Sequence, residues 1–221
     1  MIHTVIWDWN GTLLDDLEVS FSAINRVLTS NGYPPIRDLT AYREVFCFPV
    51  IEYYRRVGFD FARTPFEMLA QQFMDCYHPA AARCALAPDT LDTLRAVREL
   101  GVRQILLSAS LQSHLEMQVA RYPIREYFDR LLGIGDIYAA SKAKLAADFV
   151  GASGLPAEGF LFVGDTLHDL EVARGCGAQC LLYCGGHQSR GVLGQGGVPV
   201  IERLSQLPAF LRSAAGPDTQ R

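Results

Sequence analysis

The sequence predicts an α/β fold, in which a parallel sheet carries helices on both faces and a smaller helical unit is inserted near the amino end. Over most of the 221 residues, short apolar segments alternate with segments whose apolar residues recur at helical spacing. From about Asp15 to Cys84 this alternation stops, and aromatic and apolar residues keep helical spacing with no convincing strand. A chain of this length can bury a core for one α/β domain and an insertion.

The expected strands are short apolar runs bounded by polar or turn-forming residues. They are Thr4–Asp8, Arg103–Ser108, Arg130–Ile134, Phe160–Asp165 and Gln179–Tyr183. The helices expected between them are Asp89–Leu100, Leu111–Tyr122, Lys142–Ser153 and Leu167–Cys176. Asp89 is expected to cap the first of these helices, and Gly101 and Gly177 are expected to follow the ends of two of them.

These patterns divide the chain into two parts. Residues 1–14 and 85–221 are expected to form the sheet domain, and residues 15–84 a small helical bundle. A bundle inserted after the first strand would lie over the strand ends and act as a lid. The segment from Ser213 to Arg221 has the composition of a frayed tail.

Charge and composition argue against several classes of partner. The net charge is −4 and no block of like charge occurs, so neither nucleic acid nor an anionic membrane surface is expected to bind. No apolar run reaches the ~18 residues that span a bilayer, and no basic-then-apolar leader opens the chain. The six cysteines contain no CxxC pair, and Cys176, Cys180 and Cys184 are expected to be free thiols, as in a reducing cytoplasm.

Polar residues stand where the predicted strands end, and the carboxyl ends of parallel strands meet at one edge of a sheet. Asp8 ends the first strand, Ser108 ends the second, and Asp165 ends the fourth. Lys142 opens the helix after the third strand, and it and Lys144 are the only lysines. Either this position needs an ammonium group that a guanidinium group cannot replace, or the two lysines are neighbours by chance. Two acids, a hydroxyl and an ammonium suit a phosphoryl group held beside a divalent cation.

Four motifs in this order resemble those of the haloacid dehalogenase superfamily, in the phosphoglycolate-phosphatase-like branch with a helical cap after the first motif. They are Asp8-Trp9-Asn10-Gly11-Thr12, Ser108 closing an apolar strand, Lys142 opening a helix, and Gly164-Asp165 followed by Asp169. The resemblance extends over nearly the whole chain and implies a Rossmann-like core with that cap. It departs from the family at Asn10, where the motif has a second aspartate.

The resemblance implies a phosphatase that acts on a small phosphorylated molecule. Asp8 would attack phosphorus and form an aspartyl-phosphate that water then hydrolyses. Ser108, with Ala109 beside it, and Lys142 would bind the transferring phosphoryl group. Thr12 would brace the loop.

The resemblance also implies a Mg²⁺ cofactor. The ion would be held by the carboxylates of Asp8 and Asp165, by the backbone carbonyl of Asn10, and by Asp169 directly or through water. Only the main chain of Asn10 is needed, so the amide leaves this site intact. Without a cation, Asp8 would have to approach a phosphate group of like charge.

The amide of Asn10 cannot serve as a general acid or base, whose loss typically removes about 10²–10⁴ in rate. Three interpretations follow. The enzyme acts on good leaving groups such as acyl phosphates or phosphoanhydrides, or His187 substitutes, or catalysis has decayed and the chain binds a phosphate ligand only. The first predicts that Asn10→Asp raises turnover of alkyl phosphates more than of p-nitrophenyl phosphate.

The remaining residues allow simpler interpretations. His187 is expected to be a loop or surface histidine rather than a base, and His168 and Lys144 to face solvent. Arg43 could pair with a substrate carboxylate.

Other activities of the superfamily fit less well. A carbon–halogen hydrolase needs no metal, and a phosphonoacetaldehyde-type hydrolase needs a lysine that residues 15–84 do not contain. A phosphomutase would depend even more on an acid at position 10. The alternative from another class is a catalytically weak phosphate-binding or regulatory protein that keeps the fold. Substrate identity and oligomeric state are left open.

Overall fold

A computed structural model describes residues 1–135 and 142–214. Its centre is a six-stranded parallel sheet with strand order β3-β2-β1-β4-β5-β6. The strands are β1 (Thr4–Trp7), β2 (Arg103–Leu111), β3 (Arg130–Ile134), β4 (Phe160–Gly164), β5 (Gln179–Tyr183) and β6 (Val200–Ile201). Strand order reverses direction at β1, which lies between β2 and β4, and such a switch point is where α/β sheets bind ligands.

Strand β1 is the buried centre of the sheet, and all four of its residues are buried. Its partners are in register on both sides, with Trp7 opposite Leu106 of β2 and Val163 of β4. One residue further on, the Asp8 backbone N–H donates to the carbonyl of Val163 at 2.9 Å. Backbone hydrogen bonding alone therefore fixes the first residue after β1 to the end of β4.

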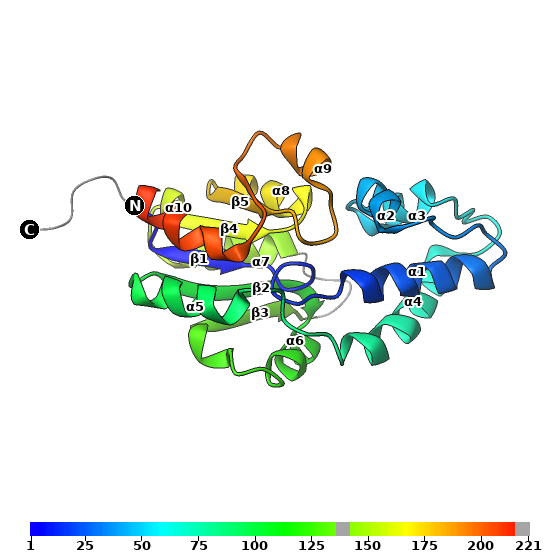
Figure 1. Cartoon of the computed structure of the whole chain (residues 1–221), viewed down its shortest axis with the longest axis horizontal. Helices are drawn as coiled ribbons and strands as arrows, with labels where there is room; N and C mark the ends of the chain where they lie inside the picture. The colour runs from blue at the N-terminus through cyan, green and yellow to red at the C-terminus, as the bar shows by residue number, and fades with distance from the viewer. Residues whose placement is uncertain (136–141, 215–221) are drawn as a thin grey trace, which may run out of the picture.

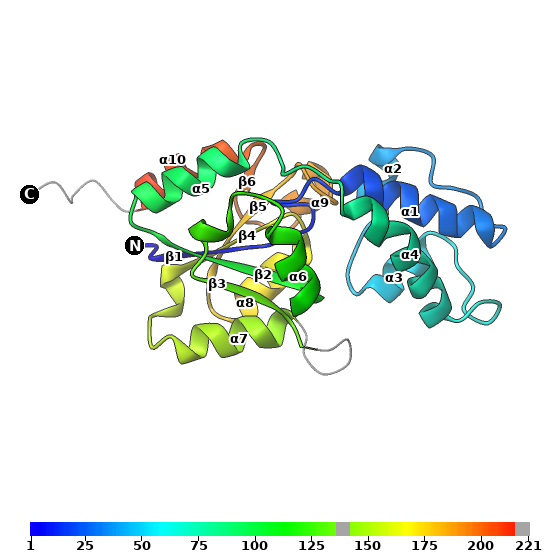
Figure 2. The ribbon, with the colours of Figure 1, turned by 90° about the horizontal axis from the view of Figure 1, so that it is seen from below.

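Helices cover both faces of the sheet, as its apolar strands require. Figure 2 shows α5 and α10 along one face and α7 along the other. One apolar core contains Trp7 and Leu106 together with residues of α5, α6 and α10, and a second contains Ile6 and Phe162 together with residues of α7, α8 and α9. These helices are α5 (Thr90–Glu99), α6 (Gln112–Val119), α7 (Lys142–Ala152), α8 (Leu167–Gly175), α9 (Arg190–Gly194) and α10 (Leu207–Ala214).

The segment after β1 forms four further helices with a core of their own. They are α1 (Leu17–Ser30), α2 (Leu39–Val45), α3 (Val50–Arg56) and α4 (Phe66–Ala81). Aromatic residues dominate this core, which includes Tyr42, Tyr53, Tyr54 and Phe59. Figure 1 shows the four helices beyond the end of the sheet at which β1 stops.

Two linkers join this four-helix segment to the sheet domain, and they are hydrogen-bonded to each other. Leu14 and Leu86 form an antiparallel bridge. On either side of it, the Asp15 N–H donates to the carbonyl of Ala85 at 3.0 Å, and the Ala87 N–H donates to that of Leu13 at 2.8 Å. The chain thus leaves and re-enters the sheet domain through one paired strip.

The structure confirms the predicted fold class and all of the predicted strands, with ends shifted by three residues at most. Gly101 and Gly177 follow helix ends with φ of 73° and 69°, as expected. Asp89 occupies the N-cap position of the first predicted helix, as expected, but its φ is 64° and its carboxylate makes no cap hydrogen bond and accepts from Ser205 Oγ instead. Short elements near the carboxyl end, β6, α9 and α10, were not predicted.

Three further expectations concern the carboxyl-terminal tail, membranes and the cysteines. Of the expected tail, Ser213 and Ala214 belong to α10, and residues 215–221 lie outside the described residues. Within residues 1–135 and 142–214, no helix combines the length and apolar character that crossing a bilayer requires. The six cysteines are free, and Cys180 is buried in β5.

Candidate active site

Three aspartates meet where β1 and β4 end. Asp8 follows β1, Asp165 follows β4, and Asp169 lies in the first turn of α8. Each offers a carboxylate oxygen, and these oxygens lie within 4.8 Å of one another. Asp165 and Asp169 are fully buried, whereas the Asp8 side chain keeps 12% of its surface exposed. The most accessible of the three acids is therefore the one at the end of the central strand.

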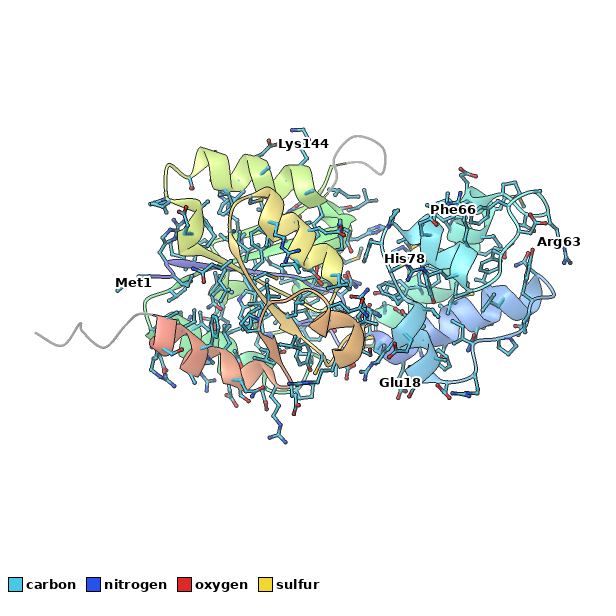
Figure 3. The ribbon with its side chains drawn as sticks, turned by 90° about the horizontal axis from the view of Figure 1, so that it is seen from above. Met1, Glu18, Arg63, Phe66, His78 and Lys144 are labelled. Atoms are coloured by element: carbon cyan, nitrogen blue, oxygen red, sulfur yellow. The ribbon has the colours of Figure 1, made fainter. Side chains whose placement is uncertain are left out.

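Lys142 joins two of these acids. Its Nζ donates to Asp8 Oδ1 and, at 2.6 Å, to Asp169 Oδ1. Burial alone would lower the pKa of Lys142, but Asp169 and Asp8 raise it above its usual value, so the ammonium stays charged. Lys144, two residues further along the same helix, is 61% exposed, pairs with Asp148 and points outward (Figure 3), as expected of a surface residue.

The donor set of this cluster fits a divalent cation. A single ammonium cannot neutralise three carboxylates, and burial raises the pKa of Asp8 to about 8 despite the attraction of Lys142. Burial likewise raises the pKa of Asp165 to about 6. Added positive charge would relieve this repulsion, and carboxylate oxygens are the ligands that Mg²⁺ prefers.

The loop after β1 can approach these acids because it contains Gly11. Its φ is +72°, and a Cβ atom there would lie 2.3 Å from Asp165 Oδ2. The next residue, Thr12, is fully buried, and its hydroxyl lies 3.1 Å from Asp165 Oδ1 and 3.3 Å from Asp8 Oδ2. Thr12 thus links the two acids across the loop, consistent with the predicted bracing role.

Asp169 is held by the start of α8. Its Oδ2 accepts from the Thr166 backbone N–H at 3.1 Å and from the Thr166 hydroxyl at 2.7 Å, as part of a capping box. Gly164 leaves space for this carboxylate, because a Cβ atom there would lie 2.2 Å from Asp169 Cγ. Burial would raise the pKa of Asp169, but Lys142 lowers it overall, so this carboxylate is ionised.

Ser108 and Ala109 lie on β2, which neighbours β1. The Ser108 side chain is buried, and its Oγ accepts from the Ser110 backbone N–H at 3.0 Å. Ala109 is exposed. β2 continues three residues past Ser108, further than predicted, and this brings Ser110 Oγ within 3.3 Å of Asn10 Oδ1. The pairing of Asn10 with Ser110 was not predicted.

The Asn10 amide is fully engaged in hydrogen bonds. Its Nδ2 donates to Asp16 Oδ2 at 3.0 Å and to the Tyr77 hydroxyl at 2.7 Å, while its Oδ1 accepts from Ser110. An amide in this arrangement holds neighbours in place and has no labile proton to transfer.

Asp16 is a buried acid that sequence reasoning missed. It is 1% exposed, and its carboxylate accepts from the Gly11 backbone N–H at 2.7 Å, from Asn10, and from the Tyr77 hydroxyl. His187 Nε2 lies 3.3 Å from Asp16 Oδ1. The one signal for Asp16 in the sequence is that it follows another acid, Asp15, just before a helix. An acid at that position is usually an ordinary helix cap, so the signal does not indicate a buried site.

His187 lies in the loop after β5, as expected, but it is buried at 5% exposure and does not lie at the surface. Its backbone N–H donates to Asp165 Oδ2 at 2.6 Å, and its Nδ1 lies 3.0 Å from the Tyr42 hydroxyl. Burial would lower the pKa of His187, but Asp16 raises it to about 9. A loop that faces other protein segments on both sides carries no local pattern that distinguishes it from an exposed one. His168, in contrast, is partly exposed and stacks on Phe48 at 4.7 Å.

The loop after β5 also binds α2 and the segment that follows it. Arg43 Nη2 donates to the Gly185 carbonyl at 2.8 Å, and Gln188 Nε2 donates to the Phe46 carbonyl at 2.9 Å. The Phe46 ring stacks on His187 at 4.9 Å. Arg43 is therefore engaged with the main chain of the sheet domain.

A family model described as haloacid dehalogenase-like hydrolase matches residues 5–183. The chain belongs to the haloacid dehalogenase-like hydrolase family. Phosphoglycolate phosphatase of Pseudomonas putida strain KT2440 is 29% identical over 225 residues, which cover 97% of this chain and 80% of that protein. The expected enzyme class, a phosphatase-type hydrolase, is confirmed by the family and by relatives of this kind.

Solved structures of this hydrolase family share the fold. A family member from Streptococcus pneumoniae superposes with a TM-score of 0.82 at 19% identity, covering 95% of this chain and 98% of that one. CbbY from Rhodobacter sphaeroides, as an aspartate-to-asparagine mutant in complex with xylulose 1,5-bisphosphate, superposes with a TM-score of 0.67 at 21% identity, covering 94% and 96%.

The pair of Asp16 and His187 predicts how stability depends on pH. The folded-state pKa of His187 is about 9, above its usual 6.5, so the pair stabilises the fold fully below pH 6.5 and loses this contribution as pH rises through 9. In chelator-treated protein, the melting temperature of wild type should fall toward that of His187→Gln between pH 6.5 and 9.5. His168→Gln is the matched control, and a wild-type advantage over His187→Gln that stays constant would contradict the assignment.

Proposed function

We propose that this hydrolase is a Mg²⁺-dependent phosphatase that acts on a small phosphorylated molecule through an aspartyl-phosphate on Asp8. The observation that carries the proposal is the bridge from Lys142 Nζ to Asp8 and Asp169 inside a buried acidic cluster. That arrangement supplies a carboxylate nucleophile, a fixed cation beside it, and oxygen ligands for a metal.

Asp8 is the nucleophile in this proposal. Its carboxylate is the accessible member of the cluster, and Lys142 and Thr12 orient its two oxygens. One oxygen attacks phosphorus as the ester oxygen leaves, and water afterwards releases phosphate from the acyl phosphate and restores the carboxylate. Lys142 and Ser108, beside Ala109, would bind the oxygens of the transferring group.

Asp8, Asp165, Asp169 and the backbone carbonyl of Asn10 would hold Mg²⁺. When bound, the ion neutralises like charge between the carboxylates and the phosphate dianion. Thr12 and the His187 N–H orient Asp165, and Thr166 orients Asp169, so each proposed ligand has a fixed direction.

Residues 15–84 act in this proposal as a cap, and residues 1–14 with 85–221 as the catalytic core. Tyr77 and Tyr42 bring cap side chains to Asp16 and His187, next to the nucleophile loop. Relatives named phosphoglycolate phosphatase, and a neighbour that binds a sugar bisphosphate, support a small phosphorylated substrate. Nothing in the net charge of −4 favours nucleic acid.

Covalent trapping distinguishes an enzyme from a protein that only binds phosphate. With Mg²⁺ and acetyl phosphate, or with BeF₃⁻, wild type should acquire an adduct at Asp8, and turnover of p-nitrophenyl phosphate should need the same residue. Asp8→Asn should give no adduct and lose at least about 10³ in kcat. Peptide mass mapping locates the adduct, and phosphate binding without adduct or turnover would support the binding-only alternative.

The Asn10 amide predicts a strong preference for good leaving groups. With no acid at residue 10, the rate of phosphoryl transfer should depend steeply on the pKa of the leaving alcohol. Acetyl phosphate and p-nitrophenyl phosphate should exceed alkyl phosphates by about 10²-fold or more in kcat. A panel of aryl and alkyl phosphates measures this slope, and equal rates across it would refute the preference.

Gly164 offers a test of the metal site. Gly164→Ala places a methyl group against the Asp169 carboxylate and should weaken Mg²⁺ binding about tenfold or more. Gly175→Ala, near the other end of α8, is the matched control, because a Cβ atom there meets nothing within 4 Å. Titration calorimetry with Mg²⁺ measures both variants, and equal affinities would count against Asp169 as a ligand.

A further inference from the structure

We propose that Asp16 is a positioning residue for the phosphatase reaction, and that Asn10 and Asp16 form a coupled pair that requires an amide at one position and a carboxylate at the other. The proposal deepens the function proposed above and rests on it. Asp16 itself does not contact substrate, because it is buried and only 1% exposed.

The Asp16 carboxylate collects donors from three separate parts of the chain. From the nucleophile loop come the Gly11 N–H at 2.7 Å and the Asn10 amide at 3.0 Å. From cap helix α4 comes the Tyr77 hydroxyl, and from the loop after β5 comes His187 Nε2 at 3.3 Å. A buried carboxylate is stable only with such a set of partners, and here each of its oxygens has two.

The donors of Asp16 determine which residue position 10 can hold. The two N–H groups of Asn10 point at Asp16 and at Tyr77, and its oxygen accepts from Ser110. A carboxylate at position 10 would put an acceptor 3.0 Å from Asp16 Oδ2 in place of a donor. Two buried carboxylates at that separation repel each other unless they share a proton.

This coupling changes the expectation for Asn10→Asp. From the sequence alone, restoring an acid at position 10 should improve turnover of alkyl phosphates. With Asp16 in place, the same substitution should displace the nucleophile loop, because Gly11 and Asn10 are the loop residues that Asp16 holds. The negative charge in this part of the site belongs to residue 16 and not to residue 10.

Exchanging the two residues should restore the pairing. With Asp at position 10 and Asn at position 16, an amide again faces a carboxylate. The new amide oxygen can accept from the Gly11 N–H, and the new carboxylate can accept from Ser110. The exchange therefore keeps the number of buried charges and reverses their positions.

The test is a double-mutant cycle on the full chain with Mg²⁺, using p-nitrophenyl phosphate and thermal melting. Asn10→Asp should lower kcat by at least about tenfold with KM within about threefold, and should lower the melting temperature. The double variant Asn10→Asp/Asp16→Asn should regain at least about tenfold in kcat over Asn10→Asp and recover most of the melting temperature. Asp15→Asn, the same charge change at the exposed neighbouring position, is the control and should shift the melting temperature less than Asp16→Asn.

The outcomes are separable from those of the proposed function. If wild type had no phosphatase activity, the proposed function would fail, and the melting temperatures would still test the coupling. If Asn10→Asp matched or exceeded wild type, or if the double variant failed to fold or gained nothing over Asn10→Asp, the coupling would be overturned.

Discussion

The constraint on which this structure depends is the repulsion among Asp8, Asp165 and Asp169 at the end of β1. Buried acids of like charge are unfavourable unless cations and hydrogen-bond donors compensate them. Here compensation comes from distant parts of the chain: Lys142 from the start of α7, Thr12 from the loop after β1, and the His187 N–H from the loop after β5. The parallel sheet makes this possible because β1 lies between β2 and β4.

Asp16 is a further buried carboxylate beside the cluster of three aspartates, and the same loops hold both. His187 joins the two, with its backbone N–H on Asp165 and its ring on Asp16. Gly11 joins them as well, since its N–H binds Asp16 while its missing side chain leaves room for Asp165. A substitution among the three aspartates should therefore affect Asp16 and its partners, and the reverse. Single substitutions near Asn10 are best interpreted as changes to both groups.

The sheet and the acidic cluster could be predicted because their signals are local. Each strand is a short apolar run, and Asp8, Asp165 and Asp169 stand at fixed distances from strand ends. The burial of Asp16 and His187 and their pairing could not be predicted, because they arise from segments 171 positions apart in the chain that fold against each other. The short β6 and α9 were missed for a related reason, since their few residues pack on elements that the local sequence does not reveal.

The paired linkers have a mechanical consequence. Because Leu14 bridges Leu86, and the Asp15 and Ala87 N–H groups bond across the same strip, the linkers resist twisting independently. A pair of linkers joined in this way favours bending of the helices beyond them over twisting. The proposed function requires these helices to open for ligand exchange at Asp8. Opening would break the contacts of the Gly185–Ser189 loop with Tyr42, Arg43 and Phe46, and also the hydrogen bond between Asn10 and Tyr77.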